Sequence, residues 1–105
     1  MSTRSLKLLD YGIDTAERDR LMYLAKCQEN TALMRLSAEE SNPGVADALF
    51  TSLTTGDGYR KMMKQGGYIP IKEDDFYAYR RRALYIFKLL LKGREAEKKM
   101  VVASH

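Results

Sequence analysis

The stretch from Ile71 to Lys92 reads IKEDDFYAYRRRALYIFKLLLK and has the clearest periodic pattern in the chain. At about 100° per residue, a helix through this stretch collects its apolar side chains in one arc. The arc contains Phe76, Tyr79, Ala83, Leu84, Ile86, Phe87, Leu90 and Leu91. The opposite side carries Arg81, Tyr85, Lys88 and Lys92. The pattern therefore predicts a long helix with one buried face and one basic face.

Both ends of this helix can be placed from the sequence. Three acidic residues, Glu73 to Asp75, open it. Carboxylates at that end complement the positive end of the helix dipole, which favours helix initiation over a metal site. The helix either ends at Gly93 or continues to Lys99, because the residues after the glycine are good helix formers.

The composition is that of one ordinary globular domain, with 45% apolar and 30% charged residues among 105. We divide the chain into an N-terminal tail (1–13), a single helical domain (14–99) and a C-terminal tail (100–105). Cys27 is the single cysteine and His105 the single histidine, which excludes an internal disulfide and a multi-cysteine metal site. Because no apolar run suits a membrane span or a signal peptide, we expect a cytoplasmic protein. We also expect no cofactor.

The other predicted helices begin at sequence signals for helix starts. The capping box Asp14-Thr15-Ala16-Glu17 starts a helix over residues 14–40. A proline at a first helical position starts a helix over 43–54, and a short basic helix over 59–65 follows a glycine turn. No segment has the pattern of a strand. We therefore predict an all-α fold: a small orthogonal or up-down bundle of three longer helices plus one short helix, with no β-sheet.

The predicted core joins the apolar arc of the C-terminal helix to the densest apolar sets of the earlier helices. From the arc it takes Phe76, Leu84, Phe87 and Leu90. From the earlier helices it takes Leu21, Ala25, Leu33, Leu36, Leu49, Phe50 and Leu53.

The predicted helix 14–40 is apolar on a second side as well. This side carries Tyr23, Leu24, Cys27 and Met34. A small domain does not readily cover both sides of so long a helix, and a helix that is apolar on two sides is either central or packed on a second chain. We therefore expect this side to form the interface of a homodimer.

The net charge of +4 is unevenly distributed. Residues 1–71 hold nine basic and nine acidic side chains, whereas residues 72–105 hold nine basic and five acidic ones. Basic groups interleaved with tyrosines suit phosphate contact and base stacking. The predicted nucleic-acid-binding residues are Arg81, Tyr85, Lys88 and Lys92, with Arg60, Lys61 and Lys64 from the short helix. The alternative is that these side chains form a solvated helix face.

Arg80 lies inside the apolar arc, where a charged group needs a partner. One interpretation pairs it with an acidic residue of the first long helix, such as Glu29, or lets it reach solvent along its stem. The other interpretation has it meet a phosphate or carboxylate of a binding partner in a groove.

Nothing in the sequence indicates catalysis. Cys27 and the serines have no histidine in the ordered chain to activate them. Gly56-Asp57-Gly58 lacks the preceding strand and the spacing of a phosphate-binding loop, so we interpret it as a turn. We therefore expect no enzyme activity, no catalytic residue, no metal site and no small-molecule substrate.

Together these patterns predict a small, regulatory, non-enzymatic binding protein. The first hypothesis is a module that binds DNA or RNA through the basic face of the C-terminal helix. The alternative is a protein-interaction or structural adaptor that self-associates through helix 14–40. The two differ in salt dependence, because phosphate contacts weaken steeply with added salt and apolar protein contacts do not.

Overall fold

A computed structural model describes residues 6–103, with side chains described as far as residue 97. This part of the chain contains five α-helices and no strand, which confirms the predicted all-α fold. The α-helices are α1 (Thr15–Lys26), α2 (Thr31–Ser41), α3 (Ala46–Thr55), α4 (Tyr59–Lys64) and α5 (Glu73–Ala103). The described 3₁₀-helices are η2 (Leu8–Tyr11), η3 (Gln28–Asn30) and η4 (Pro43–Val45).

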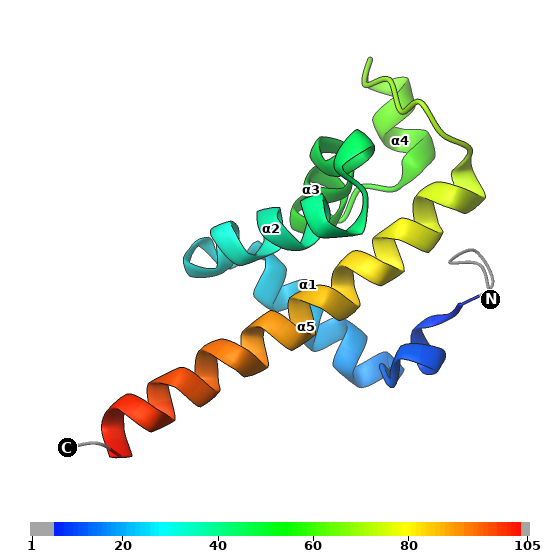
Figure 1. The fold of residues 1–105 in the computed structure, drawn as a ribbon. Coiled ribbons are helices and arrows are strands. Elements are labelled where there is room, and N and C mark those ends of the chain that lie inside the picture. The colour runs from blue at the N-terminus through cyan, green and yellow to red at the C-terminus, as the bar shows by residue number, and fades with distance from the viewer. Residues whose placement is uncertain (1–5, 104–105) are drawn as a thin grey trace.

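Helix α5 is the long axis on which the fold is built (Figure 1). The helices α1, α2, α3 and α4 and the 3₁₀-helix η2 each pack against it. It has 31 residues, a length of about 46 Å. It continues past Gly93 into the predicted C-terminal tail, and its C-terminal part extends beyond the other helices (Figure 1). Residues 104–105 of that tail lie outside the described residues.

Two apolar clusters, one around each phenylalanine of the α5 arc, form the core. Phe76 and Phe87 are both 0% exposed, as their positions in the arc predict. The cluster around Phe87 also contains Ile13, Leu21, Ala25, Met34, Leu53, Ala83, Leu84 and Leu91. The cluster around Phe76 also contains Ala38, Val45, Ala46, Leu49, Met62 and Ile69. The prediction that Leu36 belongs to the core is wrong, since its side chain is 42% exposed.

The predicted helix 14–40 is wrong in its continuity, because the structure divides it into α1 and α2. The start is correct, and the Asp14 carboxylate accepts a hydrogen bond from the backbone N–H of Glu17 at 2.8 Å. The chain leaves the helix at Cys27, whose φ of −72° and ψ of 128° are extended. The buried Asn30 side chain then donates to the Leu24 carbonyl at 2.9 Å. This bond satisfies a carbonyl that the end of a helix leaves without its usual partner.

Because the chain turns between α1 and α2, residues from both predicted apolar sides reach the same core. Leu21 of α1 and Met34 of α2 are both 0% exposed, and Leu24 packs partly buried against their cluster. The prediction of Met34 as an interface residue is therefore wrong, since Met34 is buried within its own chain. Tyr23, which is 69% exposed, and the half-buried Cys27 are what remains of the predicted interface at the surface.

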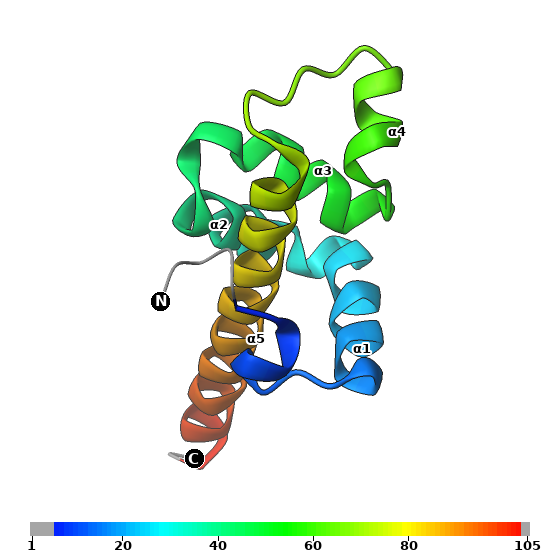
Figure 2. The ribbon, with the colours of Figure 1, turned by 90° about the vertical axis from the view of Figure 1, so that its right-hand side faces the viewer.

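Residues 6–13, predicted as part of a tail, pack against the body of the protein. Ile13 is 1% exposed and belongs to the cluster around Phe87, and η2 contacts α5. Figure 2 shows this segment lying beside α5 and leading into α1. We name Leu6–Ile13 the N-terminal strap; the first residues of the predicted tail, 1–5, lie outside the described residues.

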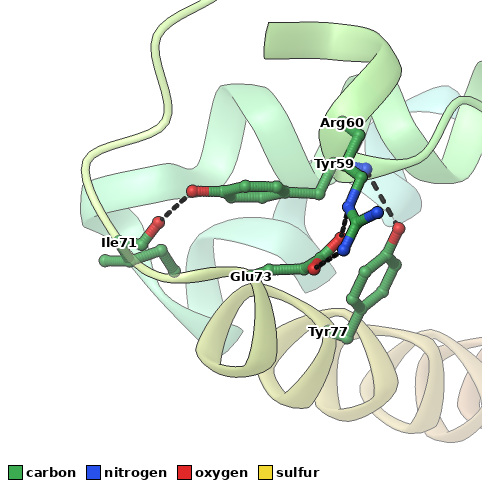
Figure 3. Close-up of polar contacts among 5 residues, drawn as sticks. All are labelled: Tyr59, Arg60, Ile71, Glu73 and Tyr77. Carbon is green, nitrogen blue, oxygen red and sulfur yellow. Dashed lines mark hydrogen bonds and ion pairs between the residues drawn. The ribbon is translucent and has the colours of Figure 1, made fainter.

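Helix α4 is fastened to the start of α5 by the polar contacts in Figure 3. The Tyr59 hydroxyl donates to the Ile71 carbonyl at 2.7 Å, and the Tyr59 backbone N–H donates to the Tyr77 hydroxyl at 3.0 Å. Arg60 donates two hydrogen bonds to the Glu73 carboxylate, at 3.1 and 3.2 Å. The first N–H of α4 therefore donates to a tyrosine of the same chain and is not open to a phosphate. The glycine turn before α4 serves as a connection between helices.

Replacing Phe87 with alanine should lower the free energy of unfolding by about 3–5 kcal/mol, because it leaves a cavity in the middle of a cluster. Urea denaturation measures the change. Leu89→Ala is the control on the same helix, since Leu89 is 46% exposed. A Phe87→Ala midpoint equal to that of the unsubstituted protein would contradict the assignment of the core.

Two glycine-to-alanine substitutions should have opposite effects. A Cβ at residue 58 would lie 2.7 Å from the Tyr77 hydroxyl. Gly58→Ala should therefore displace Tyr77 from the Tyr59 N–H and cost roughly 1–3 kcal/mol. A Cβ at residue 93 of α5 meets nothing within 4 Å, so Gly93→Ala should stabilise by about 0.5–1 kcal/mol. Thermal melting that shifts in the same direction for both variants would reject this explanation.

Candidate anion-binding site

We name the predicted basic face of α5 the basic row; it consists of Arg81, Tyr85, Lys88 and Lys92. Most of this row contacts the N-terminal strap. The Nε of Arg81 donates to the Leu6 carbonyl at 2.9 Å. The Lys88 ammonium lies 3.2 Å from the Glu17 carboxylate and 3.3 Å from the Gly12 carbonyl, and its side chain is only 12% exposed. The sequence predicts an open row here. The structure differs because a segment more than 70 residues away in the chain packs onto that face.

The aromatic residue of the row is engaged in the same way. The rings of Tyr85 and Tyr11 have centroids 4.8 Å apart, so Tyr85 packs against the strap. Among the four residues of the row, Lys92 alone has an exposed side chain. The side chain of Lys99, which would extend the row, lies outside the described residues.

The cations of α4 lie at the other end of the molecule. Arg60 binds Glu73, Lys61 lies 3.0 Å from the Asp57 carboxylate, and Lys64 is exposed. Because α4 packs near the start of α5, roughly 28 Å of helix separates this group from Lys92. The structure therefore does not bring the seven predicted nucleic-acid-binding residues together in one patch.

Arg80 has a different environment from the basic residues of the row and of α4. It lies partly buried on α5, where its Nε donates to the Ser52 hydroxyl at 2.9 Å and its guanidinium lies 5.9 Å from the centre of the Tyr77 ring. No acidic side chain among the described residues lies within ion-pair distance of it. The predicted pairing with an acid of the first helix, such as Glu29, is therefore absent from the described part of the chain.

Arg80 lines a cavity of about 350 Å³ between η2, α1, α3 and α5. We name this cavity the arginine pocket. Its lining consists of Leu8, Arg18, Asp19, Met22, Leu53, Arg80, Arg81 and Leu84. The terminal nitrogens of Arg80 make no hydrogen bond to a described residue, and neither of them is a fully buried atom.

The pocket has a positive lining with apolar walls. Three arginines against one aspartate give the lining a charge of +2. Asp19 is engaged by Arg18, whose nitrogens lie 3.1 and 3.3 Å from its carboxylate. Burial lowers the pKa of Arg80, Tyr77 raises it, and the positive charge of Arg18 lowers it again. Since arginine is protonated at any physiological pH, the pocket holds a desolvated cation beside another cation.

The sequence identifies Arg80 as unusual and Arg81 as a candidate for phosphate contact, and misses four other residues of the pocket: Leu8, Arg18, Asp19 and Met22. Arg18, Asp19 and Met22 look like ordinary residues of an amphipathic helix. Leu8 lies in the segment predicted as a tail. Their convergence depends on how η2 and α1 pack on α5, which no local pattern encodes.

Metal sites and membrane-spanning helices find no support in the described residues. Within residues 6–103 no group of three or more histidine, cysteine or acidic side chains is placed to hold a metal ion. No helix in that range is both long and apolar enough to cross a membrane. Comparison of the chain with protein-family models, with curated proteins and with solved structures found no match.

The packing of Lys88 predicts that it contributes to stability. Lys88→Gln should lower the free energy of unfolding by roughly 1–2 kcal/mol, because Glu17 and the Gly12 carbonyl lose a charged donor. Lys92→Gln, from the same row but exposed, should change it by less than about 0.5 kcal/mol. Urea denaturation of the two variants checks this. Equal midpoints would mean that Lys88 is solvated.

Proposed function

We propose that this protein is a small, non-enzymatic binding protein that recognises an anionic group, a phosphate or a carboxylate, in the arginine pocket. Arg80 is the observation that supports the proposal. Arg80 is partly buried, lines the pocket and has no acidic partner among the described residues. A desolvated charge is unfavourable unless it is paired, and a bound anion would supply the pair.

The remaining lining indicates what else the ligand carries. Arg18 and Arg80 repel each other, and an anion bound between them would attract both and offset that repulsion. The apolar side chains Leu8, Met22, Leu53 and Leu84 can hold an apolar group attached to the anion. A cavity of about 350 Å³ is within the size range of small-ligand pockets. The ligand class that fits is an anionic group on a short apolar body.

Nucleic acid is one source of such a phosphate, and it is the partner that the sequence predicts. The basic row gives it less support in the structure, because Arg81 and Lys88 already bind groups of their own chain. A nucleic acid that uses the arginine pocket should compete with a small phosphate for Arg80. One that uses only the exposed Lys64 and Lys92 should not compete.

Titration calorimetry with phenyl phosphate and with inorganic phosphate tests the proposal. Phenyl phosphate should bind more tightly, because its ring is buried on the apolar walls. Arg80→Gln should weaken its binding roughly tenfold to a hundredfold, the loss expected for a hydrogen bond to a charged group. Arg82→Gln is the matched control, since Arg82 is adjacent in sequence but exposed and outside the lining.

Two further measurements help to interpret the calorimetry. Arg80→Lys keeps the charge and loses the planar guanidinium, so its affinity for phenyl phosphate should lie between those of the unsubstituted protein and Arg80→Gln. Thermal melting checks that each variant is folded. If Arg80→Gln and Arg82→Gln bind phenyl phosphate as well as the unsubstituted protein, the pocket is not the binding site. If a single-stranded oligonucleotide binds and phenyl phosphate does not displace it, the nucleic-acid hypothesis replaces this one.

A further inference from the structure

The N-terminal strap is attached to α5 mainly through side chains of one helix face. Arg81 donates to the Leu6 carbonyl at one end, and Lys88 donates to the Gly12 carbonyl at the other. Between these points the Tyr11 ring packs on Tyr85. Three of the four residues predicted to meet a nucleic acid on this face therefore contact a segment of the same chain.

Most of the strap is only lightly buried. Leu9 is 76% exposed, and Leu8 and Tyr11 are partly buried against the core. Ile13, at 1% exposure, is the one strap residue enclosed by the core. Segments with few buried apolar contacts open at a small fraction of the free energy of global unfolding. The residues before Ile13 can therefore separate from α5 while Ile13 keeps the chain anchored.

The strap is also part of the arginine pocket. Leu8 of the strap lines the pocket, and so does Arg81, whose Nε holds the Leu6 carbonyl. Arg81 thus belongs both to the contacts that hold the strap and to the lining of the pocket. Opening of the strap would remove Leu8 from the wall and admit water beside the arginines.

We infer that the N-terminal strap is the gate of the arginine pocket, so that a bound anion and the closed strap stabilise each other. This inference rests on the proposed function. A ligand in the pocket contacts Leu8 only when the strap is closed, which gives the ligand a higher affinity for the closed state. Closure also excludes water, and the attraction between arginine and anion is stronger in the drier site. By linkage, closure of the strap raises the affinity for the ligand by the same factor by which the bound ligand favours closure.

Hydrogen exchange tests the first half of this coupling. The N–H groups of Asp10, Gly12 and Ile13 donate to the carbonyls of Lys7, Leu9 and Leu8, and so report on the strap. Saturating phenyl phosphate should slow their exchange at least about fivefold, the lower end of typical coupling between sites. The backbone N–H of Tyr59, bonded to Tyr77 at the far end of α5, should not change.

A substitution outside the pocket tests the other half. Tyr11→Ala removes the contact with Tyr85 without altering a lining residue, and it should raise the Kd for phenyl phosphate at least about fivefold. Leu9→Ala is the matched control, because Leu9 belongs to the same strap but is largely exposed. It should leave the Kd unchanged.

The possible failures can be told apart. If calorimetry detects no binding of phenyl phosphate to the unsubstituted protein, both the pocket and its gate are rejected. If the ligand binds in an Arg80-dependent manner but strap exchange stays the same, the gate is rejected and the pocket stands. The exchange measurement uses the unsubstituted protein, so it decides the question even if Tyr11→Ala does not fold.

Discussion

Burial of one face of α5 is the constraint on which the rest of the structure depends. The other α-helices in residues 6–103 have at most 12 residues each, and isolated helices of this length are marginal in water. They gain their stability by packing on α5, whose arc brings Phe76 into one apolar cluster and Phe87 into the other. The two rings are eleven residues apart on the helix, about three turns. One helix therefore carries both halves of the core.

The same constraint produces the candidate site. Arg80 lies on α5 between the two phenylalanines, so packing that buries the arc also removes part of its guanidinium from water. Ser52 satisfies only its Nε. The packing of α1 then brings Arg18 close enough to lower the pKa of Arg80 further. The fold thus leaves two cations beside a cavity, in a position that an anion would stabilise.

The sequence predicts best what depends on residues close in the chain. The arc of α5, the two buried phenylalanines and the cap at Asp14 follow from spacing and residue type. The break before α2 does not, because residues 28 and 29 are Gln and Glu, which are good helix formers. At the break the buried Asn30 amide bonds to the Leu24 carbonyl six residues earlier, a side-chain cap that helix propensity does not predict. The periodic pattern likewise places Arg81 and Lys88 on one helix face but cannot show that the strap covers that face.

The arginine pocket is tested most directly by observing the side chain of Arg80 itself. Its Nε–H is held by Ser52 and should give a distinct signal in a ¹⁵N correlation spectrum. During titration with phenyl phosphate, the Nε–H signals of Arg80 and Arg18 should shift together, saturate and give one Kd. The signal of the exposed Arg82 should stay in place. An Arg80 signal that does not move while exposed arginines shift in proportion to ligand concentration would show that the anion meets only surface charge.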